Sequence, residues 1–255
     1  MAEGDSIRRL ALRLGDALAG SAVTARSPGP RRPEGLAPER LDGREMLAAE
    51  SRGKHLLLSF EGELIVHSHL GMRGSWHLYG RGERWRRPAH RAWLALANGE
   101  VEAVNFDGSS IRIVPGSQLS RDPRLARLGP DILDHEIPSE RIAASMRALG
   151  RETALGEAVL DQTAVAGIGN IFKSEGCFAA ELDPWRPLGD LADEELERVV
   201  ERTRTLMTEA VRTGRQPQRV YRRPGRPCPR CGGRIRSRPQ GDDARVTYWC
   251  PGCQR

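Results

Sequence analysis

Four cysteines late in the sequence have the spacing of a metal site. Cys228 and Cys231 form one C-x2-C pair, and Cys250 and Cys253 form a second pair after eighteen residues. Each pair lets a tight turn point two thiolates at one centre, and two pairs complete a tetrahedral zinc site. We predict one structural zinc ion with no open position for catalysis; disulfides are the alternative, which a cytosolic setting disfavours. The fifth cysteine, Cys177, follows an apolar helical pattern and is expected in the core.

The first residues, "MAEGD", place an amine beside an acid. Removal of Met1 leaves the α-amine of Ala2 next to the carboxylate of Glu3. An α-amine has a pKa of about 8, so part of it is free base near neutral pH, and an amine next to an acid is a possible chemical site. In most proteins such an amine is only a chain terminus, and that alternative stays open at this point.

Lysine is rare in this sequence. Of its 40 basic residues, only Lys54 and Lys173 are lysines. A lysine can lose its proton when it is desolvated and an arginine cannot, so a lysine in such a chain can mark a site where arginine would not serve. Chance retention of either lysine is an equal alternative.

Two glycine-containing stretches indicate close contacts with a ligand. In "VAGIGN" (165–170), a helix that starts near Asn170 would face its free N–H groups outward, where a phosphate would fit; an ordinary glycine turn is the alternative. In "HSHLGMRGSW" (67–76), Met72 occupies a loop tip flanked by glycines. Such a residue can fill the gap left when a base leaves the stack, although single exposed apolar residues are common.

The elements that must position these residues fall into two halves. A helix with Ile7, Leu10, Leu14 and Leu18 on one face opens the chain, and Ser21–Glu50 is expected to be irregular. The sequence then predicts strands and helices. The strands are expected at 54–60, 63–70, 90–97, 101–106 and 111–115, and the helices at 139–149, 152–161, 170–180 and 190–213. The strands suggest a sandwich or a barrel, with a domain boundary within 121–138.

Charge and composition favour a nucleic-acid partner. The 255 residues are long enough for two domains, and no run approaches the roughly 18 apolar residues of a membrane helix. The start also lacks the apolar core of a signal peptide, so we expect a cytoplasmic protein without a membrane partner. The net charge is +6, and ten arginines without any acid lie between Arg212 and Arg238. Phosphate backbones are the expected partner of such a surface.

Six motifs occur in an order that resembles one family. They are "AEGD", "SRGKHLL", "HSHLGMRGSW", "LGPDIL", "VLDQTAVAGIGNIF" and "RVTYWCPGCQR", and they extend from residue 2 to residue 255. Together they resemble the formamidopyrimidine-DNA glycosylase/endonuclease VIII family of DNA repair enzymes. The first three motifs are most similar to its actinobacterial endonuclease VIII branch.

The resemblance implies a fold and an activity. The fold is α+β, with an N-terminal β-sandwich domain (1–125), a helical helix–two-turn–helix domain (126–224) and a zinc finger (225–255). Such enzymes flip out a damaged base, cleave its glycosidic bond and cut the strand by β- and δ-elimination. The implied partner is double-stranded DNA with damaged bases or abasic sites, bound by a monomer at the bacterial nucleoid.

The resemblance also implies roles for individual residues. Glu3 matches the acid at the nucleophile, Lys54 the lysine of β-elimination, and Arg245 the finger arginine of phosphate binding and δ-elimination. Glu175 matches an acid near the reaction centre. The expected catalytic set is therefore Ala2, Glu3, Lys54 and Arg245, and the expected DNA contacts are His69, Met72, Arg73, Arg127, Asn170 and Lys173.

Two positions depart from the family pattern. Position 2 is alanine where most members have proline, so the imine would form from a primary amine and more slowly. If Met1 is retained, Lys54 remains as the nucleophile. The stretch "NFDGSS" (105–110) lacks an aromatic or arginine pair, and Phe106 is either a wedge or a core residue.

Three functions are compatible with these residues. The first is a glycosylase with altered lyase activity, and the second is a DNA-damage binder that has lost its catalysis. The third, a zinc-ribbon transcription factor, leaves "AEGD" and "GKHL" unexplained. Intact Glu3, Lys54 and Arg245 favour the glycosylase. The short stretch between Asn170 and Cys228 favours oxidised pyrimidines and abasic sites, because it is short for the loop that covers oxidised purines in this family; a bulky adduct or a crosslink is an alternative substrate.

Overall fold

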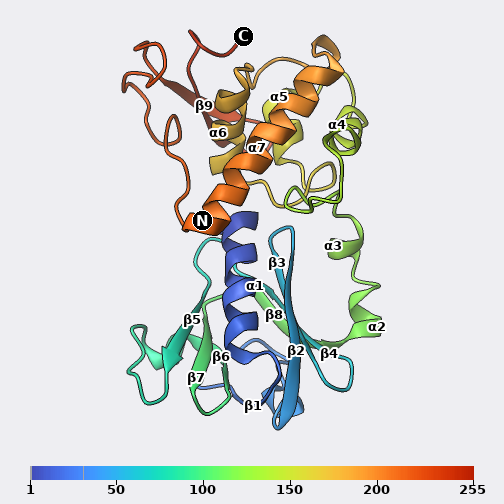
Figure 1. Cartoon of the computed structure of the whole chain (residues 1–255), viewed down its shortest axis with the longest axis vertical. Helices are drawn as coiled ribbons and strands as arrows, with labels where there is room; N and C mark the ends of the chain where they lie inside the picture. The colour runs from blue at the N-terminus through green and yellow to red at the C-terminus, as the bar shows by residue number, and fades with distance from the viewer. Residues whose placement is uncertain (1, 31) are drawn as a thin grey trace. The chain divides into compact units, whose positions relative to one another are not determined.

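The computed structural model describes residues 2–30 and 32–255, which form two compact units (Figure 1). The first unit contains Ala2 and Ser6–Ala126, and the second contains Glu3–Asp5 and Arg127–Arg255. The first helix, α1 (Gly4–Leu18), therefore begins in residues of the second unit and continues in the first. The expected separation of the zinc finger as a third domain stays a prediction.

The described residues of the first unit form eight strands and four short helices besides α1. The strands are β1 (Ser21–Arg26), β2 (Arg44–Arg52), β3 (His55–Phe60), β4 (Leu64–His69), β5 (Ser75–Gly80), β6 (Ala92–Ala97), β7 (Val101–Phe106) and β8 (Ser110–Pro115). The short helices are η1 (Pro38–Arg40), η2 (Ala89–Arg91), α2 (Gly116–Leu119) and α3 (Pro123–Ala126).

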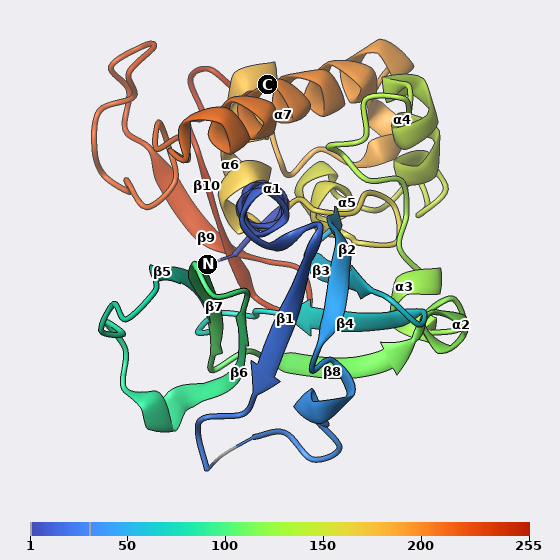
Figure 2. The same cartoon turned by 60° about the horizontal axis from the view of Figure 1, so that its bottom comes forward.

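Strand β1 joins the two layers of a β-sandwich. Its first half, Ser21–Val23, pairs with β2, and its second half, Thr24–Arg26, pairs with β6. The strand order is β5-β7-β6-β1-β2-β3-β4-β8, and Figure 2 shows β1 between β2 and β6. Because β1 changes partner halfway along, the sheet folds over into a sandwich, as the resemblance predicted.

Strand β3 places every second residue in the sandwich core. Leu56, Leu58 and Phe60 of β3 are buried in one cluster with Leu14 and Leu18 of α1. Burying a side chain of this size contributes about 1.5–3 kcal/mol. The predicted apolar face of the first helix is therefore confirmed.

The expectation of an irregular stretch from Ser21 to Glu50 is wrong, because β1 and β2 lie there. The β2 sequence "REMLAAESR" has few residues that favour strands, and pairing with both β1 and β3 overrides this weak local preference. The predicted strands correspond to β3, β4, β6, β7 and β8, whereas β5 was not predicted. Phe106 is fully buried beside Tyr79, so it is a core residue and not a wedge.

The second unit contains the predicted helices and a hairpin. The helices are α4 (Ser139–Arg147), α5 (Leu155–Leu160), α6 (Asn170–Ala180), η3 (Leu188–Asp190) and α7 (Asp193–Thr213). Strands β9 (Arg236–Gln240) and β10 (Arg245–Trp249) pair between the two cysteine pairs. In the described residues, no helix is both long and apolar enough to cross a membrane.

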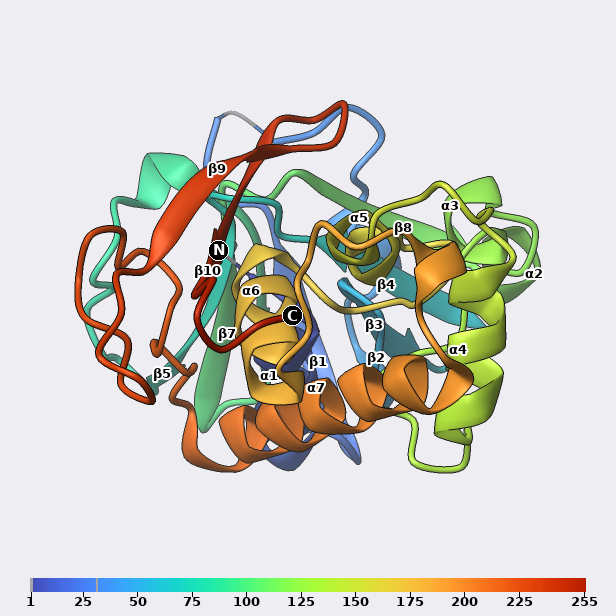
Figure 3. The same ribbon diagram turned by 90° about the horizontal axis from the view of Figure 1, so that it is seen from above.

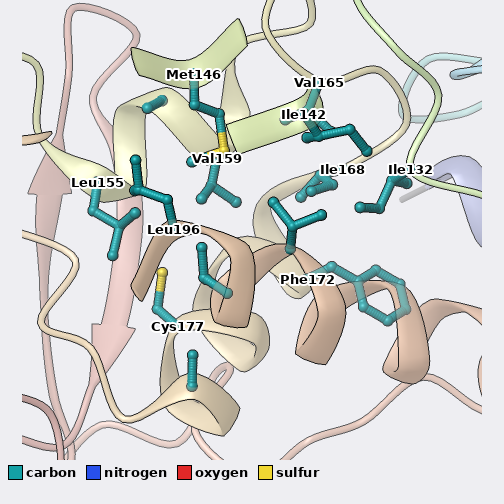
Figure 4. Packing of buried hydrophobic residues seen from close by; sticks show 14 of the residues in the cluster. Ile132, Ile142, Met146, Leu155, Val159, Val165, Ile168, Phe172, Cys177 and Leu196 are labelled. Atoms are coloured by element: carbon teal, nitrogen blue, oxygen red, sulfur yellow. The ribbon is translucent and has the colours of Figure 1, made fainter. Parts of the chain in front are cut away.

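Helix α6 is the centre of the second unit. Figure 3 shows it beside α7, and α4 packs on α7 as well. Figure 4 shows side chains from α4, α5, α6 and α7 gathered in one cluster, with Cys177 inside it as predicted. A Cβ at Gly176 of α6 would lie 2.0 Å from Oγ1 of Thr203 on α7, so glycine is required for this close approach.

Candidate active site

The carboxylate of Glu3 is held at the N-terminus of α6. Its Oε1 accepts a hydrogen bond from Ile171 N (2.8 Å), and its Oε2 accepts from Gly169 N (3.1 Å) and Phe172 N (3.2 Å). Glu3 is 0% exposed. The positive end of the helix dipole adds to these three bonds and stabilises the negative charge. The site thus contains a buried, fixed carboxylate.

Glycines in the turn before α6 make room for this carboxylate. A Cβ at Gly169 would lie 2.3 Å from Cδ of Glu3, so only glycine fits at this position. Gly167 has a φ of 102°, which L-residues rarely adopt, and its carbonyl accepts a bond from Gly4 N (2.8 Å). The turn residues therefore hold Glu3 and Gly4 by backbone contacts.

The expectation of free, outward-facing N–H groups at the start of α6 is wrong for Ile171 and Phe172, and the phosphate site itself stays a prediction. The helix does begin at Asn170, but its first N–H groups bind Glu3 instead of facing outward. The Asn170 side chain donates to the carbonyl of Val246 in β10 (2.8 Å). Its Oδ1 is buried and accepts no hydrogen bond from any of residues 2–30 and 32–255. The role of Asn170 in DNA binding stays a prediction.

Lys173 and Arg245 line one cavity in the second unit. The cavity has a volume of about 340 Å³ and lies between α5, α6 and the β9–β10 hairpin. Lys173 is 1% exposed, and its burial lowers its pKa to about 8. Arg245 is exposed at the start of β10, with its Nε 3.8 Å from the Asp243 carboxylate. The predicted DNA contact of Lys173 stays a prediction.

Glu175 anchors the chain after α7. Its Oε1 accepts hydrogen bonds from the backbone N–H groups of Val220 (2.9 Å) and Tyr221 (2.8 Å), and the residue is 1% exposed. Its Oε2 is buried and has no hydrogen-bond partner among the described residues, and the position at a reaction centre that the resemblance implied stays a prediction.

The four predicted metal ligands converge. All four sulfur atoms lie within 4.8 Å of one another. Cys228 Sγ is 3.7 Å from Cys253 Sγ, and Cys231 Sγ is 3.5 Å from Cys250 Sγ. Zinc bonds of about 2.3 Å in a tetrahedron place sulfur atoms roughly 3.8 Å apart, so these thiols fit a zinc ion. The distances are too long for a disulfide.

The arginine run from 212 to 238 forms a basic surface. Nine of its ten arginines are exposed, and Arg223 is half-buried. Aromatic rings hold three of them: Arg222 lies over Tyr221, Arg230 over Phe178, and Arg238 over Trp185. Positive charge is therefore fixed both before the first cysteine and between the cysteines in the sequence.

The first unit carries the remaining predicted residues. Lys54 is half-buried in the turn between β2 and β3, and His69 ends β4. Burial, followed by the charge of Lys54, lowers the pKa of His69. Met72 is 76% exposed in the turn after β4, and Arg73 beside it is exposed. The expected exposed loop tip is present.

A hydrogen-bonded chain of four side chains beside His69 was not predicted. Arg112 donates to Asp122 and also to Nδ1 of His67 (2.8 Å). Nδ1 of His67 is therefore an acceptor, so neutral His67 carries its proton on Nε2 and donates it to Nδ1 of His55 (2.8 Å). The four side chains come from three strands and the start of α3. Because these elements are far apart in the sequence, the only sequence signal for the arrangement is the alternation in "HSH".

Two expected residues make few defined contacts. Ala2 is half-buried and packs against the sandwich core, and Arg127 is exposed. The removal of Met1 concerns a residue outside the described ranges. Gln162, which sequence reasoning missed, shapes the turn before α6: it donates to Ile168 O (2.9 Å) and accepts from Gly167 N (3.1 Å).

A β-sandwich unit, a helical unit and a four-cysteine hairpin together define a class of DNA repair proteins. Residues 1–109 match the formamidopyrimidine-DNA glycosylase N-terminal domain, and residues 128–221 match the formamidopyrimidine-DNA glycosylase H2TH domain. The chain belongs to the formamidopyrimidine-DNA glycosylase family, as the six motifs predicted.

Curated relatives match the chain over its whole length. A "probable endonuclease 8 2" of Streptomyces coelicolor is 41% identical over 100% of this chain and 94% of its own. A "DNA-(apurinic or apyrimidinic site) lyase Nei2" of Mycolicibacterium smegmatis is 35% identical, over 100% of this chain and 99% of its own. Both organisms agree with the actinobacterial branch that the sequence indicated.

Solved structures share the fold. The MutM (Fpg) protein of Thermus thermophilus is 28% identical, with a TM-score of 0.80 over 99% of this chain and 98% of its own. A Lactococcus lactis formamidopyrimidine DNA glycosylase, bound to DNA with an abasic site, has a TM-score of 0.83 at 19% identity. The match covers 99% of both chains, and at this identity it shows a similarity of fold alone.

Proposed function

We propose that the protein is a DNA glycosylase with AP lyase activity on double-stranded DNA that carries damaged bases or abasic sites. The observation that carries this proposal is the Glu3 carboxylate, which is fully buried and fixed by three N–H groups of the turn and helix α6. It follows directly after Ala2 in the chain. Relatives aligned over the whole chain and named as endonuclease 8 or as an AP-site lyase support the same activity.

The chemistry begins at the amine of Ala2 once Met1 is removed. Its lone pair attacks C1′ of the damaged nucleotide and the bond from C1′ to the base breaks. The sugar ring then opens, because the C1′–O4′ bond breaks and O4′ takes up a proton, and the C1′=N imine remains in its protonated, iminium form. Glu3 assists the departure of the base and the formation of the imine, because a fixed carboxylate can exchange protons with the sugar. The iminium ion acidifies the C2′ proton, which permits β-elimination.

Lys54 and Arg245 act on the sugar and its phosphates in this proposal. Lys54, in the β2–β3 turn, orients the phosphate and sugar or carries a proton. Arg245, exposed on β10, binds phosphate and promotes δ-elimination. The remaining DNA contacts are His69, Met72, Arg73, Arg127, Asn170 and Lys173.

The four-cysteine cluster holds zinc in this proposal. Cys228, Cys231, Cys250 and Cys253 supply four thiolates, so the ion has no open position and serves as a scaffold. It fixes the hairpin from which Arg245 and the Val246 carbonyl project.

We assign oxidised pyrimidines and abasic sites as the substrates, and the cytoplasm and its nucleoid as the location. The support is the short chain between Asn170 and Cys228, which contains α6, η3 and α7. This leaves a connection of 14 residues, 214–227, before the first cysteine, which is short for a base-covering loop.

The proposal is tested on a duplex with one thymine glycol and on a duplex with one abasic site. The protein is expected to release the base from the thymine glycol duplex and to cut the damaged strand of both duplexes. Ala2→Pro is expected to raise the cutting rate because it supplies a secondary amine. Ala2→Ser, which keeps a primary amine, is the matched control. Tight binding to both duplexes without base release or cutting would instead identify a damage binder.

A further inference from the structure

Lys173 is a buried amine that the proposed reaction uses only as a DNA contact. It lies in the first turn of α6 and is 1% exposed. Within the described chain, residues 2–30 and 32–255, the structure gives its Nζ no hydrogen bond or ion pair, although it lines the cavity. Lysines are almost never buried unless they are paired, so the burial of this amine calls for a functional explanation.

The cavity in front of Lys173 has the size of a sugar site. Its volume of about 340 Å³ is near the lower limit of ligand pockets, roughly 300–1,000 Å³. Arg245 lies on its wall and carries a permanent positive charge, which can hold a phosphate. Four carboxylates also line it, those of Glu157 and Asp161 in the α5 region and of Asp242 and Asp243 in the hairpin turn, and they can accept hydrogen bonds from sugar hydroxyl groups. One sugar unit fits this size, with its phosphate at Arg245.

The surroundings of Lys173 favour its neutral form. Burial is the main cause that lowers its pKa to about 8, and Arg245 lowers it further. Cys177, Glu157 and Glu3 also face it and oppose the shift. Near pH 8, about half of the amine is therefore unprotonated and nucleophilic. An arginine in the same place would stay charged, which explains why one of the chain's two lysines stands here.

We propose that Lys173 is a second imine-forming amine, which captures the open-chain aldehyde of an abasic deoxyribose in the cavity beside Arg245. This inference rests on the proposed function, because that function supplies the abasic sugar. Nζ adds to C1′ of the aldehyde, the oxygen takes up protons and leaves as water, and a protonated C1′=Nζ imine remains. Loss of the C2′ proton to water then expels the 3′-phosphate, and hydrolysis of the imine restores the lysine.

The test maps covalent adducts after borohydride reduction. The protein is incubated with a duplex containing one abasic site, reduced, digested and analysed by mass spectrometry. Three amines are available: the N-terminal amine, Lys54 and Lys173. We expect an adduct on the peptide with Lys173, with a share that rises at least twofold between pH 6.5 and pH 8.5. Lys54→Arg leaves Lys173 as the only lysine and makes the assignment unambiguous.

Two variants separate amine chemistry from charge and from folding. Lys173→Arg keeps the charge and must abolish the adduct on this peptide, and Lys173→Met, of similar length, must do so as well. Zinc content and circular dichroism report on folding. The adduct on the wild-type protein needs neither variant, so a variant that misfolds leaves the test intact.

A second probe separates this inference from the proposed function. Free 2-deoxyribose 5-phosphate with borohydride tests Lys173 without any DNA, and modification of Lys173 ahead of Lys54 is expected. Adducts on the N-terminal amine alone with both probes, while strand cutting persists, would overturn the inference and leave the glycosylase proposal in place. Modification of Lys173 by the free sugar without any cutting of DNA would overturn the glycosylase proposal instead.

Discussion

The Glu3 carboxylate depends on both of its oxygen atoms. An amide at this position has one acceptor oxygen and an NH2 group that would face backbone donors, so at least one N–H group would lose its partner. We expect Glu3→Gln to abolish base excision and to lower the free energy of unfolding by about 2 kcal/mol. Single-turnover excision and urea unfolding measure the two effects. Exposed Glu152→Gln is the control, and full excision by Glu3→Gln would exclude a catalytic role for the acid.

The buried histidines make stability depend on pH. Burial lowers the pKa of His67 to about 4 and that of His55 to about 3, whereas an unfolded chain has a value of about 6.5. Between pH 6.5 and 4 the unfolded state therefore binds more protons, so the free energy of unfolding falls as the pH falls. Protonation of His67, which is 2% exposed, lowers the free energy of unfolding by up to about 1.4 kcal/mol for each pH unit in this range.

Denaturant unfolding from pH 7 to pH 4.5 measures this slope. His67→Gln is expected to flatten it, and exposed His90→Gln, in the same unit, is the matched control. Equal slopes for wild type and His67→Gln would show that His67 binds its proton equally in both states.

At the scale of elements, the turn before α6 has to remain glycine. A Cβ on Gly169 would approach Cδ of Glu3 to 2.3 Å, so we expect Gly169→Ala to displace the carboxylate and reduce excision at least tenfold. Gly15 of α1 has only Ala49 Cβ nearby, at 3.8 Å, and Gly15→Ala is the control. The control should add about 0.5–1 kcal/mol of stability. Excision assays and thermal unfolding compare the two, and normal excision by Gly169→Ala would contradict the geometry.

The β9–β10 hairpin depends on its four thiols. We expect Cys250→Ser to lose the bound zinc and most DNA affinity, because Arg245 and the Val246 carbonyl project from this hairpin. Metal analysis and the Kd for an abasic-site duplex measure both effects. Cys177→Ala, which removes the fifth cysteine from the core, should keep one equivalent of zinc. Undiminished binding by metal-free Cys250→Ser would remove the finger from the interface.

Local patterns could be predicted from the sequence, and contacts between distant residues could not. The two C-x2-C pairs and the start of α6 at Asn170 follow from spacing and turn chemistry over a few residues. The partner of the α6 N-terminus did not follow, since Glu3 lies 166 residues away from Gly169. Lys173 was recognised as unusual, but its burial depends on how α5, α6 and the hairpin pack.

At the scale of the whole molecule, we expect DNA affinity to be largely electrostatic. The net charge is +6, and the arginine surface from 212 to 238 lies in the second unit, as does Arg245. We expect affinity to fall steeply with salt and Arg245→Ala to weaken binding to all sequences alike, with a slope smaller by about 0.9 per lost phosphate contact. Exposed Arg141→Ala on α4 is the control. Titrations from 50 to 200 mM salt measure the slopes, and an unchanged slope would place Arg245 outside the interface.

Glu3 and the turn before α6 are far apart in the sequence. This separation also determines the point during synthesis at which the proposed active site can form. Residues 3–5 leave the ribosome long before the rest of their unit, which is Arg127–Arg255. The nascent chain therefore carries its acid in water until Phe172 has emerged, and contacts over such long sequence separations form late. Under the proposed chemistry, a half-made chain is not expected to attack the sugars of nearby DNA, because its acid and the helix that holds it have not yet met.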